Sequence, residues 1–202
     1  MSTHPALTSP VVLRAITPED ETRFLELANA SAAFHRPWVR LPTTPTEFSS
    51  YLSKSDQVSA ACMVTCLRNG GDLVGMVNLN DIVRGSYQKC TLGYAAFLPY
   101  VRQGYMSIAV ALAVRHAFEC LDLHRVEADI QPENIVSKKL VERLGFRREG
   151  FSPDFIRING AWRDHERWAI TQEMHMPAVS QGRMAPATPT RPPTLQDGQS
   201  PG

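Results

Sequence analysis

The sequence has no long apolar run and no excess of charge, and these absences exclude several classes of protein. No stretch approaches the roughly 18 consecutive apolar residues of a transmembrane helix. Lys plus Arg total 21 and Asp plus Glu total 20, so the net charge of +1 gives no support to electrostatic binding of nucleic acid or anionic lipid. The first residues also lack the basic and apolar segments of a secretory signal. We therefore expect a cytoplasmic protein that contacts neither nucleic acid nor membrane directly.

The sequence also lacks the cysteine spacing of a metal site or a disulfide framework. No two of its four cysteines, Cys62, Cys66, Cys90 and Cys120, stand in a C-x-x-C pattern. They lie near apolar residues, so we expect buried thiols in a reducing cytoplasm. We expect no disulfide, no zinc site and no other bound metal.

The C-terminal segment, residues 177–202, is poor in large apolar residues and rich in proline. Six of the 15 prolines lie in it, and such a composition cannot bury enough surface to offset the entropy of ordering. We expect residues 177–202 to form a disordered tail and residues 1–10 to be flexible. That leaves residues 11–176 as one domain. Within the tail, residues 189–193 could also form a polyproline II segment that binds a partner.

Apolar periodicity and turn residues predict seven strands and four helices. Strands are expected over residues 11–15, 60–67, 73–79, 90–98, 125–130 and 146–151, and within 162–173. Helices are expected from Thr17, from Thr46, over 107–121 and over 133–144. In chain order this is strand, two helices, three strands, helix, strand, helix and two strands. The order predicts an α/β (mixed α+β) fold, with helices on the faces of a mixed sheet.

One junction between an expected strand and an expected helix, residues 98–107, has features of a phosphate-binding loop. A helix start presents unpaired N–H groups and a partial positive charge. Gly104 lets a pyrophosphate approach the backbone, and Arg102 adds a cation. The segment matches neither a Rossmann G-x-G-x-x-G motif nor a P-loop. On these residues alone, an ordinary strand-to-helix turn is the alternative.

A second segment, residues 129–150, resembles a known family. It contains Asn134 and Ser137, then the triplet Leu144-Gly145-Phe146 and the pair Glu149-Gly150, in the order N-x-x-S … L-G-F … E-G. This order resembles the GNAT superfamily of acyl-CoA-dependent N-acetyltransferases, and in particular its RimJ/RimL branch, which acetylates N-terminal α-amines of ribosomal proteins. Two further stretches, residues 92–94 and 104–107, look like other markers of that branch.

The resemblance covers residues 13–174 and implies a specific architecture and cosubstrate. It implies a central mixed, mostly antiparallel sheet of about seven strands with helices on both faces. The fourth and fifth strands splay apart in such folds, and the pantetheine arm of acetyl-CoA lies between them. No metal is implied.

The resemblance also assigns residues to cofactor binding. It implies that backbone groups around Phe97 and Leu98 hold the pantetheine arm and that Asn134 hydrogen-bonds to its amides. The pyrophosphate-binding residues are then those of the loop and the first helical turn: Arg102, Gln103, Gly104, Tyr105, Met106 and Ser107. Asn134 also precedes an expected helix, so an N-cap role is the alternative.

The chain departs from the family pattern at several positions. The usual loop is Q/R-x-x-G-x-G/A, but Val101 stands where Gln or Arg is usual and Met106 where the second small residue is usual. Arg102, one place later, is the available substitute for the missing side chain. The glutamate of RimL-like proteins after the sixth strand has no counterpart, because Ile156 falls there. Phosphate binding by backbone N–H groups survives these changes, whereas the identity of the base does not follow from them.

Two residues are the candidate catalytic groups. By the resemblance, Ser137 donates a proton to the leaving thiolate; the alternative is an ordinary serine in the first helical turn. Asp129 matches an acidic residue used as base in a related ribosomal N-acetyltransferase; the alternative is a solvated strand carboxylate. Asp81 is a second candidate base, and Tyr94 is either a site residue or a core aromatic. Three histidines are expected to be structural or exposed: His116, His124 and His165.

These assignments predict an acetyl-CoA-dependent N-acetyltransferase that transfers acetyl directly to a primary amine. An α-amine has a pKa of about 7.7 to 8.0, against about 10.4 for lysine, so an N-terminal acceptor needs only a modest base. A protein N-terminus, such as that of a ribosomal protein, is therefore the expected acceptor, and a monomer or homodimer is expected. The alternatives are a small amine (an amino acid, polyamine or aminosugar antibiotic) and a non-catalytic acyl-CoA-binding module. An open groove favours a peptide, and a closed acidic pocket favours a polycation.

Overall fold

The computed structural model describes residues 9–175, so the expected tail and most of the expected flexible N-terminus lie outside the described residues. The strands are β1 (Val11–Ala15), β2 (Ala61–Leu67), β3 (Leu73–Val83), β4 (Lys89–Ala96), β5 (Arg125–Ile130), β6 (Arg147–Ile158) and β7 (Ala161–Thr171). The helices are a 3-10 turn η2 (Pro18–Asp20), α1 (Glu21–His35), α2 (Pro45–Ser53), α3 (Tyr105–Glu119), α4 (Ile135–Arg143) and α5 (Gln172–His175). The predicted order of strands and helices is confirmed, with η2 and α5 as short additions.

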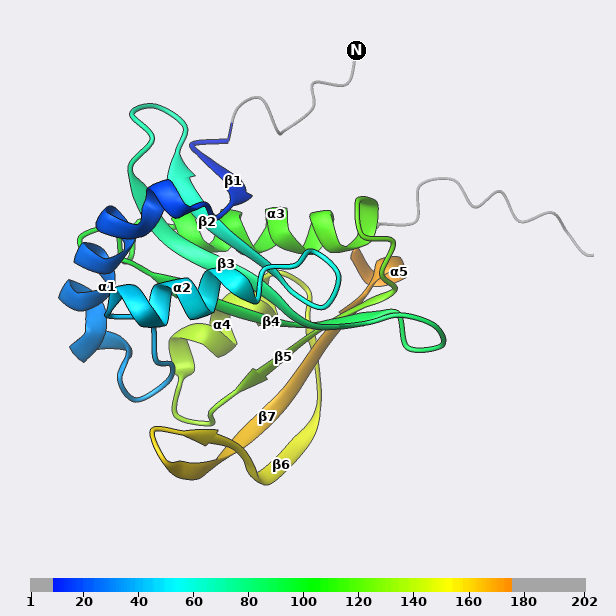
Figure 1. The fold of residues 1–202 in the computed structure, drawn as a ribbon. Coiled ribbons are helices and arrows are strands. Elements are labelled where there is room, and N and C mark those ends of the chain that lie inside the picture. The colour runs from blue at the N-terminus through cyan, green and yellow to red at the C-terminus, as the bar shows by residue number, and fades with distance from the viewer. Residues whose placement is uncertain (1–8, 176–202) are drawn as a thin grey trace, which may run out of the picture.

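The seven strands form one twisted sheet in the order β1-β2-β3-β4-β5-β7-β6 (Figure 1). Every neighbouring pair is antiparallel except β4 and β5, which run parallel. The β4–β5 ladder holds only from Lys89 to Thr91 on β4, opposite Arg125 to Glu127 on β5. Beyond Thr91 both strands continue without pairing to each other. The predicted mixed sheet and the splay between its fourth and fifth strands are therefore confirmed.

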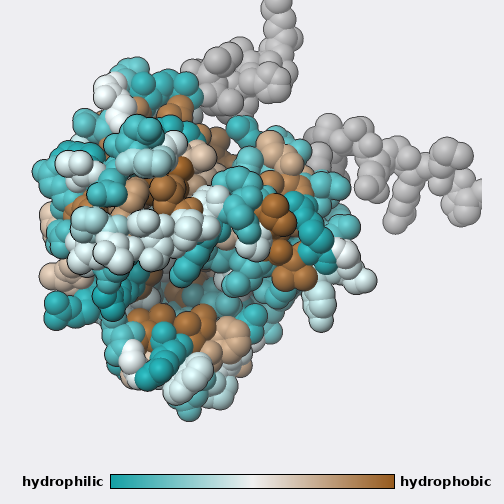
Figure 2. Space-filling model, viewed as in Figure 1, coloured by the Kyte–Doolittle hydropathy of each residue, from teal (hydrophilic) through white to brown (hydrophobic). Residues whose placement is uncertain are grey.

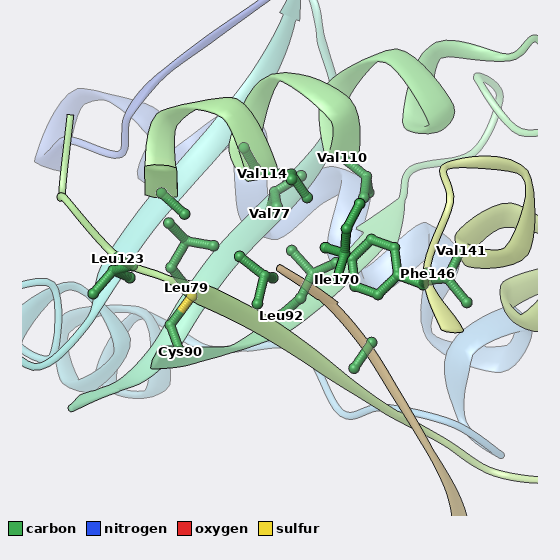
Figure 3. Close-up of a cluster of buried hydrophobic side chains, with 14 of the residues drawn as sticks. Val77, Leu79, Cys90, Leu92, Val110, Val114, Leu123, Val141, Phe146 and Ile170 are labelled. Carbon is green, nitrogen blue, oxygen red and sulfur yellow. The ribbon is translucent and has the colours of Figure 1, made fainter. Parts of the chain in front are cut away.

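Two hydrophobic cores cover opposite faces of the sheet. On one face lie α3 and α4, and Figure 3 shows Val110 and Val114 of α3 packed over the β3 side chains Val77 and Leu79. On the other face, α1 and α2 bury a cluster of aromatic rings: Phe24, Phe48 and Phe97. The alternation of side chains along each strand supplies both cores. The sheet thus forms the middle layer, and the gap between β4 and β5 connects its two faces.

The edges of the fold differ in detail from the expectations. Ser9 and Pro10, inside the segment expected to be flexible, are bonded to Arg68, the residue after β2: Pro10 O accepts from Arg68 N at 2.9 Å, and Ser9 O accepts from Arg68 Nε at 2.7 Å. Cys120 is exposed rather than buried, because it caps the C-terminal end of α3. The other cysteines are buried as expected: Cys62, Cys66 and Cys90. Within residues 9–175, no helix is long and apolar enough to span a membrane.

Candidate active site

A cleft of about 920 Å³ opens where β4 and β5 separate. Figure 2 shows a hollow in the surface between the α1–α2 layer and the β6–β7 hairpin. The predicted candidates for chemistry line this cleft together: Asp81, Tyr94, Asp129, Asn134 and Ser137. His165, which was expected to be structural, lines it too. Ile156, at the place of the missing glutamate, lines it as well. The sheet therefore brings together residues that lie far apart in the sequence.

The candidates reach the cleft from two faces of the sheet. Lys138 of α4 bonds to Glu166 of β7 at 3.2 Å, so Glu166 faces the α4 side. Strand alternation then turns Arg167 and His165 to the opposite face. Asp129 is the register partner of Arg167 and shares that face. The cleft consequently has an α4 side and a second side that carries Asp129.

On the α4 side, Tyr94 and Ser137 form a hydroxyl pair. The Tyr94 Oη lies 2.7 Å from Ser137 Oγ. Burial raises the pKa of Tyr94 to about 12, and the bond to Ser137 opposes that shift. Both hydroxyls therefore stay protonated near neutral pH, and either can donate to the other. Of the two readings open for Tyr94, the structure brings its hydroxyl to the predicted site.

Asn134 holds the start of α4 in place. Its Oδ1 accepts a hydrogen bond from Ser137 N at 3.2 Å, as an N-cap does. The Asn134 amide nitrogen makes no hydrogen bond within residues 9–175, and the residue lines the cleft. The structural role is thus present, and the NH₂ group stays available to a ligand.

On the opposite side, Asp129 contacts Arg167. Asp129 Oδ1 and Arg167 Nε are 2.5 Å apart, yet neither atom has a partner with good hydrogen-bond geometry among the described residues. The Asp129 side chain is 8% exposed, so the solvated-carboxylate alternative is wrong. Burial raises the pKa of Asp129, while the nearby charge of Arg167 opposes the rise. The contact is a buried ion pair with a poorly directed hydrogen bond.

The other candidate groups occupy different environments. Asp81 is exposed, at a left-handed position (φ 49°) in an irregular stretch of β3. His124 is exposed beside Glu173, with 3.5 Å between Nδ1 and Oε1. His116 is half-buried on α3, and burial lowers its pKa. His165 is buried, with Nδ1 2.9 Å from Arg163 O, as a structural histidine would be, but it also lines the cleft.

The expected phosphate loop has an unusual backbone. Arg102 (φ 62°) and Gly104 (φ 81°) are both left-handed, and Gly104 is the N-cap of α3. Within the part of the chain that the structure describes, none of the N–H groups of residues 101–106 has a hydrogen-bond partner. A Cβ built on Gly104 would meet nothing within 4 Å, so the backbone is open to a ligand there. A run of free N–H groups at the start of a 15-residue helix fits a pyrophosphate.

Met106 fits into this loop because β3 makes room for it. A Cβ on Gly75 would lie only 2.6 Å from Met106 Sδ, so the thioether fills the space beside Gly75. Met106 also packs on the core under α3. The bulky residue at the usual glycine or alanine position is therefore accommodated by a glycine on the sheet.

The end of β4 is tied to the α1 side. Phe97 N donates to Val74 O at 2.9 Å, and Leu98 N donates to Ser31 Oγ at 3.0 Å. The N–H groups of Phe97 and Leu98 already have partners inside the protein. If this stretch holds a pantetheine arm, it does so through carbonyl oxygens or side-chain surface.

The comparisons with known proteins agree with this geometry. The family described as acetyltransferase (GNAT) domain matches residues 11–147. The chain belongs to the GNAT acetyltransferase family. A ribosomal protein uS5-alanine N-acetyltransferase of Escherichia coli (strain K12) is 28% identical to this acetyltransferase over 177 aligned residues, covering 81% of this chain and 89% of the relative.

Solved structures share the fold of the acetyltransferase. RimJ from Mycobacterium smegmatis, solved in complex with CoA-disulfide, has a TM-score of 0.75 at 27% identity and covers 81% of this chain and 82% of its own. A spermidine N-acetyltransferase from Vibrio cholerae, solved with CoA and spermine, has a TM-score of 0.71 at 21% identity, with coverage of 82% and 98%. The second likeness shows the fold alone. The chain is thus a GNAT-type acetyltransferase related to ribosomal-protein N-acetyltransferases.

Two contacts at and beside the cleft of the acetyltransferase were not predicted from its sequence. Gln131 Nε2 donates to Pro37 O at 3.0 Å, and Asn159 Nδ2 donates to Arg36 O at 2.5 Å. These bonds tie the loop after α1 to β5 and to the β6–β7 turn. The two partners of each bond lie 94 and 123 residues apart, so no local pattern signals them.

Proposed function

We propose that this acetyltransferase moves an acetyl group from acetyl-CoA directly to a primary amine, and that the acceptor is the N-terminal α-amine of a protein. The observation that carries the proposal is the Tyr94–Ser137 hydroxyl pair in the cleft between β4 and β5. If the pantetheine arm of acetyl-CoA lies between β4 and β5, its sulfur would come close to this pair. When bound, acetyl-CoA supplies an activated acyl group and a thiolate that can leave.

The loop before α3 supports acetyl-CoA as the cosubstrate. Its free N–H groups at residues 101–106 suit a pyrophosphate, and Arg102 supplies a positive charge beside them. Asn134 can donate its free NH₂ group to the pantetheine amides while its Oδ1 caps α4. These groups would hold the pyrophosphate and the pantetheine arm of one extended molecule.

Ser137 has the position of a proton donor to the sulfur, and Tyr94 has the position of a donor to Ser137. Ser137 Oγ can release a proton toward sulfur while accepting one from Tyr94 Oη, because the two oxygens are 2.7 Å apart. The pKa of the partly buried Tyr94 is raised to about 12, so its hydroxyl is protonated near neutral pH and can donate. General-acid help typically contributes about 10²- to 10⁴-fold to a rate, and we expect the low side of such effects for Ser137.

Asp129 is the group that we assign to the amine. An arriving ammonium must lose a proton before it can attack. Asp129 lies on the face opposite to Ser137, so the amine and the sulfur would be served from different sides. Burial raises the pKa of Asp129, and the Arg167 charge beside it holds the carboxylate in place on the side of the cleft that would receive the amine.

The charges of the cleft favour a single amine over a polycation. Two cationic residues, Arg40 and Lys54, line the cleft together with its carboxylates. Asp129 is neutralised by Arg167, and Asp56 accepts hydrogen bonds from three neighbouring backbone N–H groups. Arg40 is itself paired with Glu47, so Asp81 is the lining carboxylate that has no partner among the described residues. A single free carboxylate suits one ammonium group better than a polyamine. An N-terminal peptide presents one charge and fits this balance.

An acceptor screen tests the proposal. The purified chain is mixed with acetyl-CoA and short peptides with a free N-terminus, the same peptides with a blocked N-terminus, free amino acids, spermidine and an aminosugar. Thiol release and product mass are measured. We expect turnover with free N-termini and none when only a lysine amine is available. Turnover with small amines alone would contradict the acceptor, and acetyl-CoA binding without any turnover would show a non-catalytic module.

A further inference from the structure

We infer that His165 Nε2 is the atom that takes the proton from the substrate ammonium, with Asp129 stabilising the imidazolium that forms. This inference rests on the proposed function and deepens it, because Asp129 and His165 lie on the same side of the cleft. It follows from the tautomer, the placement and the neighbours of His165.

The backbone fixes the tautomer of His165. Its Nδ1 lies 2.9 Å from Arg163 O. A carbonyl oxygen can only accept, so in the neutral ring Nδ1 carries the hydrogen and Nε2 carries a lone pair. Among the hydrogen bonds of residues 9–175, none involves Nε2. A ring held through one nitrogen, with the other free to accept, is the arrangement that a general base requires.

The ring is buried but reaches the cleft. His165 is 3% exposed, so little solvent competes for Nε2, yet the residue belongs to the cleft lining. Phe155 covers the ring edge, with 6.2 Å between centroids. Packing and the Nδ1 bond together restrict the ring to one orientation. His165 thus combines a buried ring, an Nε2 without a bond among the described residues and a place in the cleft lining.

The neighbouring charges favour His165 over Asp129 as the final acceptor. Asp129 is in contact with Arg167. Protonation of the Asp129 carboxylate would leave the Arg167 charge without its partner, which is unfavourable. His165 and Asp129 share one face of the sheet, and the charge of His165 is among the influences that lower the Asp129 pKa. The other charged residues that line the cleft are Arg40, Lys54, Asp56 and Asp81. A carboxylate next to the ring stabilises the imidazolium.

The proton transfer balances within the cleft. One N–H bond of the ammonium breaks, its electron pair stays on the amine nitrogen, and the proton forms a bond to Nε2. The amine becomes a neutral nucleophile, and the proton later leaves His165 for solvent. Ser137, on the α4 face, serves the sulfur separately. Base and acid therefore stand on opposite faces of the sheet and act through the gap between β4 and β5.

The experiment uses variants that separate the two ring nitrogens. His165→Asn keeps a donor at the place of Nδ1 and removes Nε2, whereas His165→Gln puts an amide at the place of Nε2. Neither can take a proton. We expect kcat to fall about 100-fold or more in both, with the dissociation constant for acetyl-CoA unchanged. His124→Asn, at an exposed site beside Glu173, is the matched control and should keep full activity.

A readout independent of activity is the nitrogen NMR of the histidine rings in the full chain. We expect His165 to be protonated at Nδ1, and its Nε2 signal to move when CoA and the acceptor peptide are added together. Added imidazole should restore part of the activity of His165→Ala. Folded Asn and Gln variants with kcat within threefold of the wild type, or an NMR signal showing hydrogen on Nε2, would overturn the inference. If the wild type itself acetylates nothing, the proposed function fails, and NMR still decides the placement of His165.

Discussion

The phenolic oxygen of Tyr94 lies 2.7 Å from the hydroxyl oxygen of Ser137, and this contact joins β4 to α4 across the mouth of the splay. The two residues are separated by 43 positions in the chain. Ser137 also gives its backbone N–H to Asn134, so its side chain and its backbone have different partners. Mutation of the side chain can therefore separate a catalytic role from a capping role.

Removal of either hydroxyl should slow turnover. In Ser137→Ala the bond from Ser137 N to the Asn134 cap remains, so we expect the melting temperature to stay near that of the wild type. kcat should fall roughly 10- to 100-fold, at the low side of general-acid effects, with KM for acetyl-CoA little changed. Tyr94→Phe keeps the ring and should show a smaller loss of the same kind. Steady-state kinetics and thermal unfolding of both variants check this, and intact kcat in both would remove the pair from the mechanism.

A negative charge at Gly104 should weaken coenzyme A binding. Gly104→Asp places a carboxylate beside the free N–H groups that would hold the pyrophosphate. We expect the dissociation constant for coenzyme A to rise about tenfold or more, which is about 1.4 kcal/mol. Gly85→Asp is a matched control, because Gly85 also has a positive φ (67°) and open space around it. Thermal unfolding should show a similar loss of stability in both variants, and calorimetric titration should show a loss of affinity only at Gly104.

The local patterns of the sequence predicted the elements that carry the site better than the contacts within it. Asn134 before an apolar periodic stretch, with Gly145 after it, predicted α4 within two residues at its start, because caps and left-handed turns act over a few residues. β6 runs to Ile158, well past the expected end at 151, because its pairing with β7 is interrupted after Ser152 and resumes at Ile156. The sheet geometry decides this, not the local preference.

Partners across the sheet could not be found from the sequence alone. Arg167 lies 38 positions after Asp129, and only the β5–β7 register shows that the two side chains are neighbours. Met106 departs from the family loop, and the space for its side chain comes from Gly75 on β3, which no local pattern indicates. His165 gave no sign of its free nitrogen, because the bond that fixes its tautomer depends on the β7 backbone. These contacts depend on how distant strands pair, and a short sequence motif does not contain that pairing.

Filling the space at Gly75 should destabilise the fold. A Cβ there would lie 2.6 Å from Met106 Sδ and 2.6 Å from Ala95 O, and the second atom belongs to the backbone. We expect Gly75→Ala to cost about 1–3 kcal/mol, as overpacking does. Adding Met106→Ala should recover only part, since Ala95 O remains. Urea unfolding of the single and double variants checks this, and full recovery would show that the thioether alone limits the site.

Glu149 should contribute stability that acid removes. Arg125 and Arg147 bond to its carboxylate and lower the pKa of Glu149 to about 2, from an ordinary value of 4.5. A carboxyl with a depressed pKa stabilises the folded state above its unfolded pKa, and loses that contribution as pH falls through the folded one. The bonds join β5 to β6, but solvent screens them in part because Glu149 is partly exposed.

Glu149→Gln should therefore unfold at a lower temperature than the wild type at pH 7. The difference in unfolding temperature should disappear as pH falls from about 4.5 to about 2. Over that range the wild-type carboxylate becomes protonated, whereas the side-chain amide of the variant has no proton to gain. Glu119→Gln is the control, since Glu119 is an exposed helix residue 3.7 Å from Arg115. Thermal unfolding between pH 2 and pH 7 measures each gap. A gap for Glu149→Gln that stays constant with pH would show that the carboxylate charge is not what stabilises the β5–β6 contact.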